Sequence, residues 1–300
     1  MEVLINEKPV DVTLEDERTL GEVLDELRGW LGNAELYITD VVVDEQNVRL
    51  DTPESWAAMS IDDVGRIEIN ALPPWQVKAN GLRVIASYFE ILRDVLQADD
   101  RERLTELSAE AQYIAEGLPT YAGDLVNRND RTDVFFRIID APEVRQAVLP
   151  DAERRRELQG YLDQAVTVLR ARQRELSQPH TEAWATSEAL QGLLSQVTEV
   201  SVLLQRGEDR EAMDLLVRFT ELTSKLLRVM PQVARTTGSD ELSIEQLERY
   251  GAELNATLEE LVEAFGVQDS VLIGDLVEYE LVPKIEELIR IVPPVSSETA

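Results

Sequence analysis

The run from Gly274 to Pro283 is the most distinctive stretch in the chain, and it contains side chains that could carry out chemistry. Asp275, Glu278 and Glu280 surround Tyr279 within this short stretch. Carboxylates brought together in this way can bind a divalent cation or transfer protons. If side chains of this run have a function, we expect Tyr279 and Glu278 to act together.

Two structural explanations compete with a functional one for this run. Pro283 removes one helical hydrogen bond, so it should kink the helix that carries these residues. A solvated acidic face would explain the carboxylates, and a kinked helix that packs Tyr279 in the core would explain the tyrosine. We retain Asp275, Glu278, Tyr279 and Glu280 as a candidate interaction surface, and we assign no catalytic, cofactor-binding or metal-binding residue.

Other catalytic groups are scarce in this sequence. The 300 residues contain no cysteine and a single histidine, His180, which follows Pro179 in a predicted loop. A phosphotransfer histidine would instead be exposed in the middle of a bundle helix, and one histidine cannot supply the repeated Glu-x-x-His pairs of a di-iron bundle. Phosphate-binding glycine motifs and the Gly-x-Ser-x-Gly motif are also missing from the sequence. We therefore expect a protein that is not an enzyme and that holds no cofactor.

The charge balance limits the partners of the chain. The 59 acidic and 29 basic residues give a formal net charge of −30, which repels nucleic acids and anionic membranes. The basic cluster Arg154-Arg155-Arg156 is flanked by Glu153 and Glu157, so we interpret it as an exposed helix face rather than a phosphate site. No apolar run approaches the roughly 20 residues that span a bilayer, and the first residues do not have the pattern of a signal peptide. We expect a cytoplasmic protein with basic or amphipathic protein partners, and a homo-oligomer is compatible with the sequence.

The elements that position these residues begin with a β-rich segment. Apolar residues alternate around Val3, Ile5 and Val10, and Thr19 and Glu22 have the spacing of a helix capping box. Further strand-like stretches follow at 37–43, 47–50 and 66–70. This order resembles the β-grasp domains of ubiquitin-like and sulfur-carrier proteins, and the resemblance covers less than a quarter of the chain. Those carriers end in a free Gly-Gly tail, whereas this chain continues through Ala71-Leu72-Pro73-Pro74, so a carrier role is not expected.

From about residue 77 onward, apolar residues recur at the three- and four-residue steps of helices that bury one side. Three helix pairs turn at an acidic or glycine corner, at 99–100, 207–209 and 266–269, and each pair is followed by a proline stop at Pro119, Pro231 or Pro293. This pattern predicts antiparallel helical hairpins without a strict repeat length.

The predicted fold class is therefore α+β, with a small β-grasp-like N-terminal domain followed by a mostly α-helical bundle. We expect domains at 1–72 and 77–294, a proline-rich linker at 73–76, and a flexible tail at 295–300. The leading functional hypothesis is a non-enzymatic scaffold or adaptor, because a sheet edge and helical grooves are common docking elements. The alternatives are a chaperone-like helper for a secreted or flagellar-type client, and a carboxylate-based metal-binding protein or enzyme.

Overall fold

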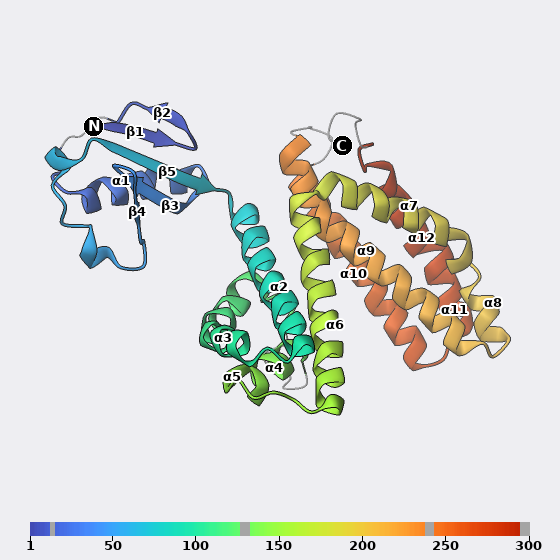
Figure 1. Cartoon of the computed structure of the whole chain (residues 1–300). Coiled ribbons are helices and arrows are strands. Elements are labelled where there is room, and N and C mark those ends of the chain that lie inside the picture. The colour runs from blue at the N-terminus through green and yellow to red at the C-terminus, as the bar shows by residue number, and fades with distance from the viewer. Residues whose placement is uncertain (13–15, 127–132, 238–242, 295–300) are drawn as a thin grey trace. The chain divides into compact units, whose positions relative to one another are not determined.

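The computed structural model describes residues 1–12, 16–126, 133–237 and 243–294 (Figure 1). The chain forms two compact units, Met1–Gln173 and Arg174–Ala300, which are treated separately below. A small mixed sheet comes first and a mostly helical region follows, so the predicted α+β class is confirmed. Within the described residues, no helix has both the length and the apolar character needed to cross a membrane.

The first unit opens with a five-stranded sheet in the order β2-β1-β5-β3-β4. Strands β1 and β5 are parallel and the other neighbours are antiparallel. The strand bounds are β1 (Glu2–Ile5), β2 (Lys8–Val10), β3 (Tyr37–Val43), β4 (Gln46–Val48) and β5 (Arg66–Leu72). This sheet is compatible with the β-grasp-like domain that the sequence resembles.

One helix, α1 (Leu20–Asn33), supplies the apolar layer against this sheet (Figure 1). Its buried side packs against alternate residues of the central strands, because successive side chains of a strand point to opposite faces of the sheet. The shared core includes Leu20, Val23, Leu24, Leu27 and Leu31 from the helix and Val3, Val41, Ile67 and Ile69 from the sheet. The predicted capping box is confirmed. The Thr19 hydroxyl accepts from the Glu22 N–H, and the Glu22 carboxylate accepts from the Thr19 N–H.

The remaining α-helices of the first unit follow β5 almost at once. They are α2 (Pro74–Ala98), α3 (Arg101–Tyr121), α4 (Val134–Ile139), α5 (Pro142–Arg145) and α6 (Ala152–Ser177), and the boundary between the units lies within α6. Residues 74–76, predicted as linker, are instead the first turn of α2. Pro74 suits this position because the N–H that it lacks would have no helical partner there. The domain limits 1–72 and 77–294 stay a prediction, and the predicted tail 295–300 lies outside the described residues.

The second unit consists of helices that share one apolar core. Their bounds are α7 (Pro179–Val197), α8 (Val200–Gln205), α9 (Asp209–Thr237), α10 (Ile244–Gly266), α11 (Ser270–Asp275), η3 (Leu276–Leu281) and α12 (Val282–Arg290). Helix α7 packs along α9, and α11 packs on α8. Gly274 permits the second contact, since a Cβ at this position would lie 2.6 Å from the Cβ of Ser201.

The three predicted corners are confirmed. Asp99, Gly207 and Gln268 have positive φ angles of 54°, 77° and 56°, which reverse the chain at the ends of their helices. The prediction that Pro119 and Pro231 end their helices is wrong, because both prolines lie inside helices. Helix α9 continues for six residues beyond Pro231, where Val233 and Ala234 are buried, so their burial offsets the missing hydrogen bond.

Candidate interaction surfaces

The run Gly274–Pro283 folds into an unusual helical turn. Helix α11 ends at Asp275, and residues Leu276–Leu281 form the π-helix η3 directly before Pro283. Proline has no N–H to donate, and its ring clashes with the carbonyl four residues earlier, which here belongs to Tyr279. A wider π turn gives that carbonyl room, and such turns occur frequently at functional sites. The predicted effect of Pro283 on the helix thus takes the form of a π turn.

The four predicted surface residues are all exposed. Asp275 lies at the end of α11, and Glu278, Tyr279 and Glu280 lie side by side in η3. Tyr279 is 67% exposed, so the alternative in which it packs in the core is wrong. The charge of Glu278, together with a hydrogen bond to it, raises the pKa of the Tyr279 phenol. The phenol hydroxyl donates that hydrogen bond to the Glu278 carboxylate.

Glu280 also has a structural contact. Lys284 of α12 donates to the Glu280 carboxylate at 3.0 Å and to the Thr257 hydroxyl of α10 at 2.8 Å. Thr257 is buried, so Lys284 joins α12 to α10 at the edge of the core. Among the described residues, no group of three or more histidine, cysteine, aspartate or glutamate side chains could hold a metal ion.

Apolar side chains are exposed next to this run, where α10 turns into α11. Val262, Val267, Val271 and Leu272 are 71%, 74%, 64% and 43% exposed, and we call these four residues the apolar corner. The corner is built locally. Gln268 reverses the chain, and the Asp269 carboxylate accepts hydrogen bonds from the N–H groups of Val271 and Leu272, which caps α11. The opposite side of these helices, which carries Leu261 and Ile273, packs into the core, so the valines remain exposed to solvent.

The stretch of sequence that contains the apolar corner is acidic and has no basic residue. No lysine or arginine occurs between Arg249 and Lys284, whereas eight acidic residues do: Glu253, Glu259, Glu260, Glu263, Asp269, Asp275, Glu278 and Glu280. Exposed apolar groups that are rimmed by polar residues often mark a protein-interaction site. The sequence located the turn at 266–269, but it did not reveal that the valines around it are exposed.

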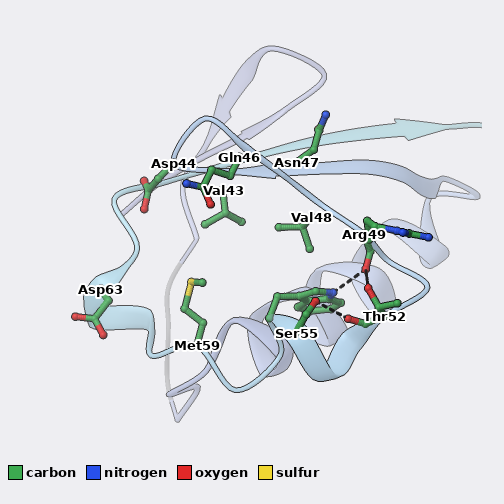
Figure 2. Close-up of a pocket in the computed structure, with 11 residues that line it drawn as sticks. Val43, Asp44, Gln46, Asn47, Val48, Arg49, Thr52, Ser55, Met59 and Asp63 are labelled. Carbon is green, nitrogen blue, oxygen red and sulfur yellow. Dashed lines mark hydrogen bonds between the residues drawn. The ribbon is translucent and has the colours of Figure 1, made fainter.

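A second candidate surface lies on the sheet of the first unit. A cavity of about 650 Å³ opens between the β3–β4 hairpin and the segment from Arg49 to Asp63. Figure 2 shows Val43 and Val48 pointing toward the side on which Met59 lies, whereas Asn47 points the other way. Trp56 also lines this cavity and is itself almost fully buried.

Both walls of this cavity are held by hydrogen bonds. The Trp56 indole N–H donates to the carbonyl of Arg49 at 2.8 Å, and the Ser55 hydroxyl donates to the carbonyl of Thr52 at 2.8 Å (Figure 2). On the opposite wall, the Asp44 carboxylate accepts from the N–H of Arg66 at 2.8 Å, which fixes the hairpin loop to β5. The cavity is therefore preformed, as ligand-binding cavities usually are.

The remaining predicted sites have structural partners. Arg154 pairs with Glu143 and Glu157, and Arg155 pairs with Asp99, so these cations of the basic cluster are matched by acids of the same unit. His180 lies in the first turn of α7 rather than in a loop, with its Nε2 2.8 Å from the Thr236 hydroxyl of α9. These contacts give the basic cluster and the histidine roles in packing.

Comparison with known proteins identifies two regions of the chain. Residues 1–73 match the family model of the TP0873 N-terminal domain, and residues 185–291 match the model of a Domain of unknown function (DUF8042). Neither description names an activity or a ligand. No curated protein matches the chain, and no solved structure matches it either. The first match spans the sheet with α1, and the second includes the apolar corner and η3.

Proposed function

We propose that this chain is a non-enzymatic protein-interaction module, a scaffold or adaptor, that binds a basic amphipathic segment of a partner protein at the apolar corner. The observation that carries the proposal is the exposure of Val262, Val267 and Val271 in a stretch with eight acidic residues and no cation. Burying these side chains against apolar groups of a partner would supply affinity. The surrounding carboxylates would select basic partners and speed their association.

A basic partner fits this surface better than a second copy of the chain does. With a net charge of −30, two copies would bring together surfaces of the same sign. A helix with lysine or arginine beside an apolar stripe would satisfy both parts of the surface, because amphipathic helices commonly dock through their apolar face. Tyr279 extends the surface along η3, because its exposed ring offers an apolar face.

The proposal is tested by capturing partners on the immobilised full-length chain from the native cell extract. A doubly substituted variant, Val267→Lys with Val271→Lys, removes two exposed apolar groups and adds the charge that a basic partner carries. Val84→Lys with Val148→Lys is the matched control, because these valines are 50% and 48% exposed and lie in the other unit.

The expected result is that the same stoichiometric protein binds the unchanged chain and the control variant, but not the corner variant. The hypothesis fails if the chain is recovered alone in every arm, or if the corner variant retains the partner. Thermal melting of both variants shows whether each remains folded.

A chaperone-like helper is the second candidate, and the same surface supports it, because clients expose amphipathic segments before they assemble. A captured protein that is already folded and stable alone indicates an adaptor. If the captured protein aggregates alone and light scattering falls when the chain is added, the helper role is supported.

A further inference from the structure

The two edges of the five-stranded sheet differ in their hydrogen-bonding groups. Each edge strand follows a two-residue hairpin loop with positive φ angles, at Asn6-Glu7 and at Asp44-Glu45. The residues that flank such a loop form a hydrogen-bonded pair, and the next pair along the ladder is not hydrogen-bonded. On each edge strand, the second residue after the loop therefore points its backbone N–H and C=O away from the sheet.

On β2 this outward position is occupied by Pro9, which pairs with Leu4. Proline has no N–H, so this edge cannot offer a donor to another strand, a common protection of edge strands. On β4 the equivalent residue is Asn47, which pairs with Val42. Asn47 is exposed and retains its N–H, and we call its outward N–H and C=O the open edge.

The cavity lies beneath the open edge. Gln46 and Val48 flank Asn47, and their partners Val43 and Val41 are buried on the inner face of the sheet. Side chains alternate between the two faces along a strand. In a strand added at this edge, the residue opposite Asn47 would therefore point to the outer face, and its two neighbours would point to the inner face. Val43, Val48, Trp56 and Met59 form the apolar part of the cavity lining on that side. An added strand would thus place two side chains, at i and i+2, over a preformed cavity.

The charges around the open edge identify the kind of strand that fits. Between residues 40 and 63 there are seven acidic residues and one basic residue, Arg49, which is paired with Asp51 at 2.9 Å. A second copy would bring the same acidic segment to the edge, so self-association is disfavoured by charge repulsion. A segment with lysine or arginine between its apolar residues complements this surface.

We propose that the open edge of β4 binds an extended basic segment of a partner protein as an added β-strand, with apolar residues at i and i+2 entering the cavity. The site is separate from the apolar corner and takes an extended rather than a helical ligand. Backbone hydrogen bonds to Asn47 supply affinity, and the cavity supplies side-chain selectivity, as in other cases of strand addition.

The test uses nuclear magnetic resonance titration of the full-length chain with the probe peptide acetyl-Lys-Val-Lys-Val-Lys-Val-Lys-amide. Two control peptides carry a methyl group on the backbone nitrogen of each of the three central residues, or glutamate in place of every lysine. The expected result is a shift of the Asn47 amide signal and slower exchange of its hydrogen with the alternating basic peptide, and neither effect with either control.

Two substitutions separate strand addition from general attraction to an acidic surface. Asn47→Pro removes the outward donor without touching a ladder hydrogen bond, in the same way as Pro9 on β2, whereas Asn47→Thr keeps the donor. We expect Asn47→Pro to weaken peptide binding by at least about tenfold and Asn47→Thr by less than about twofold. Met59→Arg places a cation at the exposed rim of the cavity and should also weaken binding. If Asn47→Pro does not fold, the N-methylated peptide decides the question, because it keeps the charge and the side chains of the probe and lacks only the backbone donors.

Several outcomes would overturn the proposal. They are the absence of any binding, equal binding of the N-methylated peptide, or shifts spread over the acidic surface that do not include Asn47. Undiminished binding by Met59→Arg would count against the cavity. Sedimentation that reveals a dimer broken by Asn47→Pro would show that the occupant is a second copy.

Discussion

Substituting Gly81 by alanine tests how closely α2 and α3 approach. A Cβ built at Gly81 would lie 2.2 Å from Cγ and 2.3 Å from Cδ1 of Tyr121, more than 1 Å inside the usual carbon contact of about 3.5 Å. Glycine to alanine in a helix normally adds about 0.5–1 kcal/mol of stability. Forcing an extra carbon into a packed site costs about 1–3 kcal/mol. We therefore expect Gly81→Ala to lower stability.

Gly160 provides the matched control. It lies in α6, within the same unit, and a Cβ there meets nothing within 4 Å, so Gly160→Ala should gain the helical contribution alone. The difference between the two substitutions should be roughly 1–3 kcal/mol, which is the cost of the contact with Tyr121. In a Tyr121→Ala background, Gly81→Ala should become neutral or stabilising. A double-mutant cycle would then report the contact between the two positions as a coupling energy.

Urea unfolding followed by circular dichroism measures these differences. Because a chain of two compact units need not unfold in one step, hydrogen exchange of amides in α2 and α3 provides the local measurement. If Gly81→Ala stabilised the protein as much as Gly160→Ala, Tyr121 would not cover Gly81, and the close packing of α2 on α3 would be wrong.

Three further predictions concern local interactions. Thr19→Ala should cost about 1 kcal/mol, because it removes the capping oxygen of α1, and thermal unfolding that leaves stability unchanged would argue against the capping box. Hydrogen bonds from Arg170 lower the pKa of Glu90, so this carboxylate stabilises the fold above its unfolded pKa of about 4.3 and loses that contribution as the pH falls below it. Glu90→Gln should therefore destabilise most at neutral pH and least near pH 3 in paired melts, and a pH-independent difference would contradict this reasoning. Pro283→Ala restores an N–H after η3, so residues 276–281 should shift toward α-helix, with a gain in stability of at most about 3 kcal/mol because the π turn already relieves part of the clash. Unchanged backbone chemical shifts would show that proline does not cause the π turn.

Features set by a few neighbouring residues were predicted well from the sequence. The capping box at Thr19 and Glu22 and the helix corner at Asp99 depend on local hydrogen bonds and backbone angles, which residue types reveal directly. Proline was a poorer guide. Pro119 and Pro231 lie inside helices, and at Pro231 the burial of following residues, such as Val233, outweighs the local penalty.

The candidate surfaces were only partly predictable. Asp275, Glu278, Tyr279 and Glu280 are exposed as a predicted surface requires. The sequence predicted that Pro283 disturbs the helix, but it did not show that the disturbance is a π turn with three consecutive exposed side chains. The exposure of Val262 and Val271 could not be read from the sequence, since valines beside a helical stripe are as often buried. A sheet edge was expected as a docking element, but the difference between Pro9 and Asn47 became visible only with the strand register.

Binding of a partner at the apolar corner is tested most directly by hydrogen–deuterium exchange and mass spectrometry of the full-length chain, alone and in complex with the protein that co-purifies with it. Slower exchange in peptides covering residues 259–280, with little change in α7 and α9, is the predicted result. Protection confined to other helices, or no protection at all, would contradict binding at the corner formed by Val262, Val267, Val271 and Leu272.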